Sequence, residues 1–95
     1  MRNYADANID ALFSAILTLR NTEECYSFFE DVCTIPELKE FGMRLEVARL
    51  LKKGQKYSEI SRLTGSSTAT ISRVNKCLQY GSGGYNMVLD RLGIK

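Results

Sequence analysis

Apolar residues recur at intervals of three and four along most of the chain, the spacing that places side chains on one face of an α-helix. The spacing predicts six helices, at about residues 9–19, 22–33, 35–53, 58–64, 68–80 and 85–92. No stretch alternates apolar and polar residues as a half-buried strand would, and no segment repeats. The pattern therefore predicts an all-α fold.

Residues suited to capping mark where these helices begin and end. Thr34 and Glu37 have the spacing of a capping box, and Pro36 fits the first turn of the third helix because its missing N–H is not needed there. Gly54 and Gly65 are expected to end the third and fourth helices. Further N-caps are expected at Asn8, Thr22, Ser58 and either Ser66 or Ser67.

The third helix is apolar on more than one face. Phe41 and Leu45 lie on one side of it, and Val47 and Leu50 extend the apolar surface to others, which is typical of a helix at the centre of a core or of a subunit interface. A chain of 95 residues buries only a modest core, so dimerisation is a plausible further source of stability. We expect a single domain over 1–95 that forms a homodimer.

Residues 57–76 fit a helix-turn-helix. A glycine supplies the sharp turn between two short helices, and only Ile60, Leu63, Ile71 and Val74 need to be buried to hold those helices crossed. The stretch GSSTATISR at the turn carries one apolar side chain larger than alanine, which leaves the start of the second helix free to approach another surface closely. An ordinary helical hairpin with a polar surface is the alternative.

The charge is divided unevenly along the chain. Residues 1–41 hold three basic and eight acidic residues, a net charge of −5, whereas residues 42–95 hold ten basic and three acidic residues, a net charge of +7. A basic half favours a polyanionic partner through contacts with phosphate groups. Charge alone is equally consistent with a solvated surface, so its combination with the helix-turn-helix predicts binding to double-stranded DNA.

The expected DNA contacts divide between bases and phosphates. The N-terminal residues of a recognition helix meet base edges in the major groove, where threonine and alanine methyl groups contact thymine and arginine binds guanine or a phosphate. The expected base-reading residues are Thr68, Ala69, Thr70, Ser72 and Arg73. The expected phosphate contacts are Lys56, Ser58, Arg62 and Lys76, with plain solvation as the alternative for each lysine.

Other classes of function find no support in the sequence. There is no histidine and no CxxC pair, and the cysteines are odd in number, so we expect free, buried or half-buried thiols and neither a metal site nor a cofactor. No nucleophile lies beside a base and no glycine-rich phosphate loop occurs, so we expect no enzyme activity. The absence of a bilayer-spanning run and of a secretory signal indicates a cytoplasmic protein without a membrane partner. A protein-interaction module that uses the helix-turn-helix for docking is the alternative function.

Several motifs occur together along the chain: Thr34, Glu40-Phe-Gly-Met-Arg44, Leu50-Leu51, Glu59-Ile60 and Ala69-Thr-Ile-Ser-Arg73. In combination they resemble the tryptophan repressor family, and the whole chain is similar to its branch of small repressor-like proteins of the YerC/YecD type. The resemblance implies an intertwined, all-helical homodimer in which helices of both chains build one core. It assigns residues 1–54 and 85–92 to dimerisation and residues 57–76 to the DNA-reading head of a transcriptional repressor.

The resemblance also implies a possible ligand pocket between the central helix and the recognition helix. Members of the family hold tryptophan there with two arginines, which Arg44 and Arg73 match, while Thr34 matches a residue near the amino group of the ligand. Val74 stands in place of a glycine and Cys77 in place of a serine that contacts the ligand; valine adds bulk, and cysteine is a poor hydrogen-bond partner. We therefore expect a regulator that does not respond to tryptophan and that uses either no effector or a different one.

Overall fold

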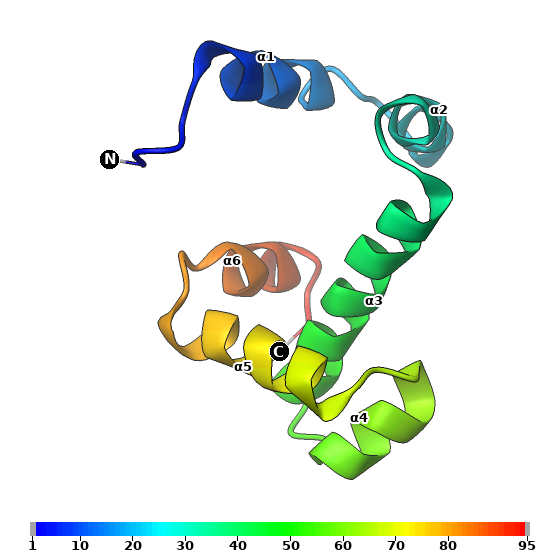
Figure 1. Cartoon of the computed structure of the whole chain (residues 1–95), viewed down its shortest axis with the longest axis vertical. Helices are drawn as coiled ribbons and strands as arrows, with labels where there is room; N and C mark the ends of the chain where they lie inside the picture. The colour runs from blue at the N-terminus through cyan, green and yellow to red at the C-terminus, as the bar shows by residue number, and fades with distance from the viewer. Residues whose placement is uncertain (1, 95) are drawn as a thin grey trace. The chain divides into compact units, whose positions relative to one another are not determined.

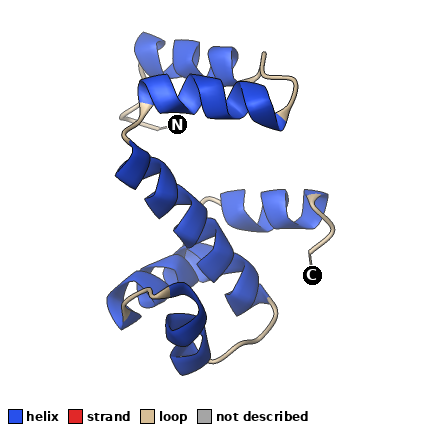
Figure 2. Ribbon diagram, turned by 90° about the vertical axis from the view of Figure 1, so that its right-hand side faces the viewer, coloured by secondary structure: helices blue, strands red, loops and turns tan. Residues whose placement is uncertain are grey.

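The computed structural model describes residues 2–94 and contains six α-helices in that range (Figure 1). They are α1 (Ala7–Ile16), α2 (Thr22–Val32), α3 (Ile35–Lys52), α4 (Tyr57–Thr64), α5 (Thr68–Tyr80) and α6 (Gly84–Arg91). No strand occurs among these residues, as Figure 2 shows, and none of their helices is long and apolar enough to cross a membrane. The prediction of an all-α chain of six helices is confirmed, with helix ends displaced by up to three residues.

The capping box at the start of α3 is confirmed. The backbone N–H of Thr34 donates to Glu37 Oε1 at 2.9 Å, and the N–H of Glu37 donates to Thr34 Oγ1 at 3.2 Å. Ser67 is the N-cap of α5, so one of the two serines expected there is confirmed. Both helices start where a short polar side chain satisfies a backbone donor of the first turn.

Three other expected N-caps are wrong. At α1 an Asp two residues earlier, and at α2 an Asn one residue earlier, accepts a hydrogen bond from the backbone of the first turn. At α4 the residue before the helix is a lysine, whose side chain has no acceptor to offer. The observed residues are Asp6, Asn21 and Lys56, in place of Asn8, Thr22 and Ser58.

Inter-residue contacts divide the chain into two compact units, with the boundary after Leu38, inside α3. In the second unit, four helices each contribute one fully buried large side chain to a common core. These are Val47 from α3, Ile60 from α4, Ile71 from α5 and Leu89 from α6, and they are joined in the core by Ala48, Leu50 and Val74. This core holds α4 and α5 in place and thereby positions the helix-turn-helix.

The first unit has no comparable core among its described residues. No residue of α1 or α2 is buried, and Leu17 is 84% exposed. The rings of Phe28 and Phe29 pack edge to face, with centroids 5.5 Å apart, but both side chains remain half-exposed. The apolar stripes of α1 and α2 are therefore open to a further surface.

The turn between α4 and α5 contains Gly65 in the left-handed conformation, with φ of +73°. Its backbone N–H donates to Ser61 O at 2.8 Å, which closes α4. The expected burial of Leu63 is wrong, because this side chain is 52% exposed. Instead α4 directs Ile60 and Thr64 toward the core side, one helical turn apart, and the Thr64 hydroxyl donates to Ile60 O at 2.7 Å.

The cysteines are more exposed than the sequence suggested. Cys33 is half-buried, as expected, but Cys25 and Cys77 are exposed, and all three are free thiols. The expectation of buried or half-buried thiols is therefore wrong for two of them. Cys25 lies four residues before Phe29 on α2, a helix that buries none of its residues, and Cys77 lies three residues after the buried Val74 on α5 but is itself exposed.

Candidate nucleic-acid interface

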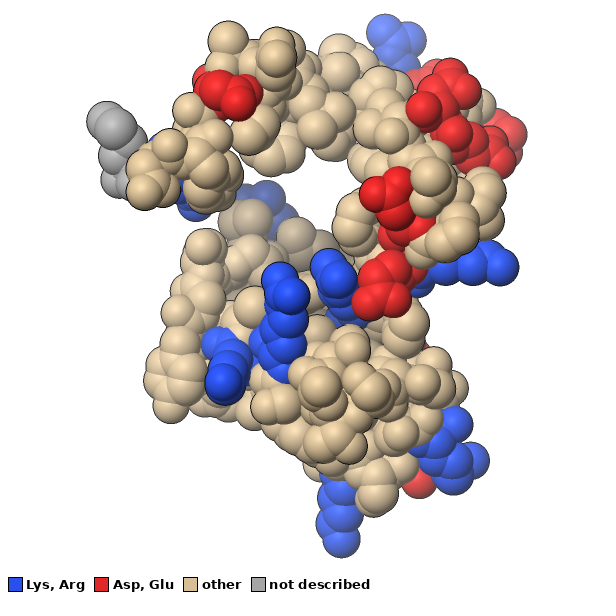
Figure 3. Space-filling view, viewed as in Figure 1, with Lys and Arg blue, Asp and Glu red and all other residues tan. Residues whose placement is uncertain are grey.

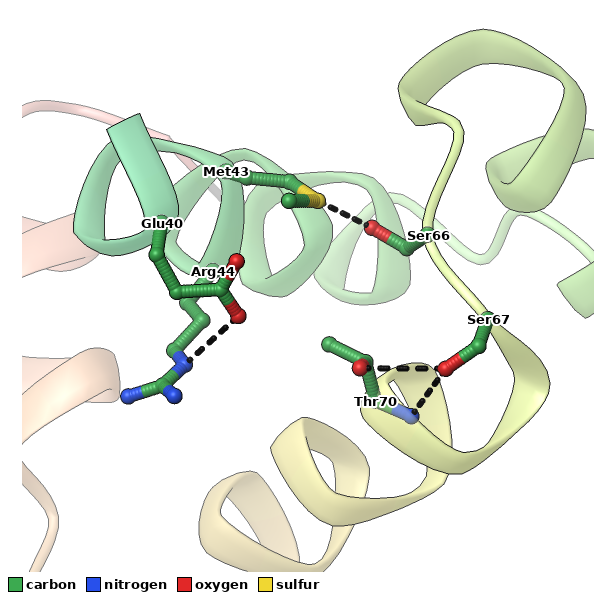
Figure 4. Close-up of polar contacts among 6 residues, drawn as sticks. All are labelled: Glu40, Met43, Arg44, Ser66, Ser67 and Thr70. Atoms are coloured by element: carbon green, nitrogen blue, oxygen red, sulfur yellow. Dashed lines mark hydrogen bonds and ion pairs between the residues drawn. The ribbon is translucent and has the colours of Figure 1, made fainter. Parts of the chain in front are cut away.

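Two serines of the turn fix the N-terminal end of α5 (Figure 4). Ser67 Oγ accepts a hydrogen bond from the backbone N–H of Thr70 at 3.2 Å and donates to the Thr70 hydroxyl at 3.1 Å. Ser66 is only 4% exposed, and its hydroxyl donates to Sδ of Met43 on α3 at 2.7 Å. Because Ser66 is bonded to α3 and Ser67 caps α5, the first turn of α5 has a defined position on the core.

Helix α5 has a core face and an open face. Its core face consists of Ile71 and Val74, both almost completely buried. Of the residues expected to read bases, Thr68, Ala69 and Arg73 are exposed, whereas Thr70 and Ser72 are half-buried. Since all but one of these side chains are small, the helix backbone can approach another surface closely.

The residues expected to bind phosphates differ in their surroundings. Lys56, Ser58 and Lys76 are exposed. Arg62 is also exposed, but its Nε donates to Glu59 Oε2 at 3.1 Å and its terminal nitrogen bonds to the other carboxylate oxygen. These hydrogen bonds lower the pKa of Glu59 and raise the pKa of Arg62. The pair lies three residues apart on a helix, a spacing that brings side chains together.

Basic side chains gather on the second unit. In Figure 3 most of the visible Lys and Arg side chains lie over that unit, and the acidic side chains gather mainly on α2, as the division of charge in the sequence predicts. Several of these bases are balanced locally; for example, Arg49 pairs with Glu46 at 2.6 Å. Lys56, Arg73 and Lys76 form no ion pair within residues 39–94, so the unbalanced positive charge includes both ends of the helix-turn-helix.

A hollow of about 330 Å³ lies beside α5. Its lining comes from α3, α5 and α6 and comprises Glu40, Arg44, Ala69, Thr70, Arg73, Val74, Cys77 and Tyr85. Four of the five residues expected in a ligand pocket, Arg44, Arg73, Val74 and Cys77, are thus brought together. The fifth, Thr34, is not among the lining residues, and its hydroxyl serves the capping box.

Two lining residues, Glu40 and Tyr85, were not among the site residues expected from the sequence. Glu40 Oε1 lies 3.4 Å from Nε of Arg44 (Figure 4), and the separation of four residues on one helix is a signal that could have revealed this pair. Tyr85 reaches the hollow from α6 across a glycine-rich link, so no local pattern indicates it. Burial raises the pKa of the Tyr85 phenol, the nearby Cys77 thiol adds to that effect, and Arg44 and Arg73 oppose it.

The model of the family described as Trp repressor protein matches residues 7–93. The chain belongs to the Trp repressor family. This confirms the resemblance inferred from the motifs of α3, α4 and α5. Membership of the Trp repressor family indicates a DNA-binding helix-turn-helix regulator rather than an enzyme.

Relatives within the Trp repressor family match nearly the whole chain. A protein of Bacillus subtilis (strain 168) named "Uncharacterized protein YerC" is 55% identical over 84 residues, which cover 88% of this chain and 81% of that protein. The crystal structure of a proposed Trp repressor from Staphylococcus aureus has a TM-score of 0.92 at 50% identity and covers 96% of this chain and 91% of that one. The structure of a TrpR-like protein from Eubacterium eligens ATCC 27750 has a TM-score of 0.91 at 49% identity, with coverage of 94% and 92%.

Proposed function

We propose that this chain is a cytoplasmic transcriptional regulator, a repressor, which binds specific sequences of double-stranded DNA as a homodimer. The observation that carries the proposal is the start of α5, where a small, hydroxyl-rich face is exposed, anchored to the core and accompanied by unbalanced positive charge. Family membership supports the general class of function.

Helix α5 enters the major groove and reads bases. Thr68 and Ala69 offer methyl groups to thymine, and Arg73 has the guanidinium fork that recognises guanine. The half-burial of Thr70 and Ser72 places them nearer to the core side of this face, so they meet base edges only when the backbone of α5 comes close. The absence of bulky side chains at the start of α5 permits that approach.

Phosphate contacts come from both sides of the base-reading face. Lys56 and Ser58 stand at the start of α4, whose first N–H groups have no side-chain cap and are directed toward the preceding chain and solvent. Lys76 lies on the exposed side of α5, two turns after its start. Arg62 must share its guanidinium between Glu59 and a phosphate, so it contributes less than Lys56 or Lys76.

The homodimer is proposed because the chain exposes apolar surface that a partner copy would cover. Phe13 and Tyr26 are each 55% exposed in the first unit, and Leu92 is 62% exposed after α6. We assign residues 1–54 and 85–92 to this dimerisation surface, although Leu89 itself packs into the core of its own unit. Two symmetric copies would present their α5 helices to half-sites about one turn of DNA apart.

Selection of bound duplexes from a random pool, followed by titration of variants, tests the proposal. Combining Thr70→Ala with Arg73→Ala should weaken binding to the selected duplex by about 1–3 kcal/mol for each lost base contact and relax sequence choice there. Lys76→Ala should weaken all duplexes alike and flatten the salt dependence. A double variant that binds its site as tightly as wild type contradicts the assignment of α5. Failure to bind any duplex at low salt would favour a docking module.

We also propose that tryptophan is not the corepressor of this regulator. Arg44, which would bind the ligand carboxylate, is next to Glu40, whose negative charge opposes a second carboxylate. Val74 is 2% exposed and forms part of the wall of the hollow, so an indole ring cannot approach the backbone there as it could at glycine. Where the family has a serine that contacts the ligand, Cys77 offers only a weak hydrogen-bond donor.

Calorimetry of the full chain with L-tryptophan tests this second proposal. We expect no saturable heat and no change in affinity for the selected duplex when tryptophan is added. Cys77→Ser is the matched variant, because it restores a hydroxyl and leaves the buried wall of Val74 intact. A micromolar dissociation constant, with tighter DNA binding in the presence of tryptophan, would show that the hollow accepts the amino acid despite these substitutions.

A further inference from the structure

A group of polar contacts, which we call the clasp, connects the last residue of α3 with α6 and with the C-terminal end of α5. It consists of Lys52, Asn86, Asp90 and the carbonyl group of Leu78. Lys52 Nζ donates to Asn86 Oδ1 at 2.7 Å and lies 3.4 Å from Asp90 Oδ1. Asn86 Nδ2 donates to Leu78 O at 3.0 Å. One asparagine side chain therefore links three helices.

The Leu78 carbonyl is a group that α5 cannot satisfy with its own backbone. The last four carbonyl groups of a helix have no intrahelical donor, and α5 ends at Tyr80. The N–H of Gly81 donates to Cys77 O at 3.0 Å, and the side-chain amide of Asn86 provides the donor for Leu78. Asn86 is therefore a C-terminal cap of α5 that is supplied by a different helix.

The path of the chain after α5 is constrained as well. A Cβ atom placed on Gly81 would lie 2.5 Å from Cys77 O, which is closer than a side chain tolerates. Glycine at this position lets the chain turn tightly against the last turn of α5. That turn leads directly into the link before α6 and returns Asn86 to within hydrogen-bonding distance of Leu78.

Hydrogen bonds consequently connect α5 to α3 near both ends of α5, through Ser66 in the preceding turn and through Asn86 of α6. At the N-terminal end, Ser66 donates to Met43 of α3 at 2.7 Å. At the C-terminal end, Lys52 of α3 reaches Leu78 through Asn86. The apolar contacts between these ends are not directional, so they permit small rotations and translations that hydrogen bonds resist. Base readout depends on hydrogen-bond geometry and is therefore sensitive to such movements.

We propose that Asn86 is a positioning residue for DNA reading, which acts through the Leu78 carbonyl and contacts no nucleotide itself. Lys52 orients the Asn86 amide, and its charge is used in the clasp and not on a phosphate. This inference rests on the proposed DNA-binding function and adds to it a residue outside the helix-turn-helix. It follows that specificity depends on α6 as well as on α5.

Two substitutions separate the roles of the Asn86 side chain. Asn86→Asp keeps an acceptor for Lys52 but replaces the donor to Leu78 O with an oxygen. Asn86→Leu removes both hydrogen bonds and keeps a side chain of similar size. Gln79→Glu, at an exposed position near the same end of α5, is the control for the added negative charge. The full chain is used throughout, and sedimentation at matched concentrations checks that assembly is unchanged.

Two measurements are made on each variant. Hydrogen–deuterium exchange over residues 77–83 reports whether the last turn of α5 has loosened. Titration with the duplex selected by wild type, and with random duplex, reports the ratio of specific to non-specific binding. We expect both Asn86 variants to exchange faster and to lose roughly fivefold to tenfold in that ratio, the range expected for one lost hydrogen bond, while Gln79→Glu changes neither.

The possible failures are distinguishable. If wild type selects no duplex, the proposed function is wrong, and the positioning role fails with it. If wild type selects a duplex and the Asn86 variants keep the wild-type ratio, only the positioning role is wrong. A loss of specific and random binding by the same factor, with a lowered unfolding midpoint, would also overturn it, because that is the behaviour of a residue that merely stabilises the fold.

Discussion

Among single residues, Glu37 couples the start of α3 to pH. Its carboxylate accepts the backbone N–H of Thr34 at 2.9 Å, and this bond, together with the Thr34 hydroxyl, lowers the pKa of Glu37 below its ordinary value of 4.5. A carboxyl group whose pKa is lowered by folding stabilises the folded state above its unfolded pKa. That contribution is lost as the pH falls through the folded pKa.

We predict that Glu37→Gln removes part of the acid sensitivity of folding. Wild type should lose stability below about pH 5 more steeply than the variant, because glutamine still bonds to the Thr34 N–H but does not titrate. Urea unfolding at a series of pH values measures the difference. Identical pH profiles for wild type and Glu37→Gln contradict the prediction.

The residues that the sequence identified correctly are those whose partners are close in the chain. The cap formed by Thr34 and Glu37 involves residues three apart, and so does the cap that Ser67 provides to Thr70. Asn86 was not anticipated, because its contacts with Lys52 and Leu78 form only when α3, α5 and α6 are packed. A pattern along one helix contains no information about such contacts.

At the scale of elements, the turn between α4 and α5 depends on the left-handed conformation of Gly65. An L-residue other than glycine is strained at a φ of +73° by roughly 1–2 kcal/mol, because its Cβ approaches the following carbonyl oxygen. Among the described residues, no atom outside Gly65 and its two chain neighbours lies within 4 Å of a Cβ at this position, so the cost arises in the local backbone and not from packing. A substitution at Gly65 therefore measures the cost of the left-handed backbone conformation to folding stability, without a contribution from packing.

We predict that Gly65→Ala lowers the free energy of unfolding by about 1–2 kcal/mol and weakens DNA binding in the same preparation. Gly65→Asn is the matched control, since asparagine tolerates the left-handed region better, and it should cost less than alanine. Urea titration measures the free energy of unfolding of both variants, and titration with the selected duplex measures their DNA binding. If alanine and asparagine destabilise equally, the conformation of the turn is not what requires glycine.

Element by element, periodicity predicted all six helices but not always their inner faces. In a helix of two turns, the side chains at i+3 and i+4 lie on either side of the same line, so Ile60 could pair with Leu63 or with Thr64. The structure uses Thr64, whose hydroxyl bonds to Ile60 O, and leaves Leu63 exposed. Apolar residues on several faces of the long α3 indicate contacts on several sides, and three of them, Val47, Ala48 and Leu50, are buried in the core of the second unit.

At the scale of the whole molecule, the two units differ in how many of their large apolar side chains they bury. The second unit buries large side chains from α3, α4, α5 and α6, whereas α1 and α2 bury none. A hydrophobic stripe on a helix is stable only when another surface covers it. The sequence could predict these stripes, but it could not show what covers them, because that depends on a second surface that the pattern does not describe.

We predict that a second copy of the chain covers them and that Phe13 lies in the interface. Phe13→Asp should weaken the dimer by about 10- to 100-fold for each buried ring, because burial of a large apolar side chain contributes about 1.5–3 kcal/mol and each tenfold corresponds to about 1.4 kcal/mol. Two-fold symmetry would place the substitution in the interface twice. Gln55→Asp, at an exposed position outside residues 1–54 and 85–92, adds the same charge and should leave assembly intact. Sedimentation over a range of concentrations measures the dissociation constants, and the wild-type unfolding midpoint should rise with concentration. A wild-type chain that is folded and monomeric at micromolar concentration would show that α1 and α2 are not covered by a second copy.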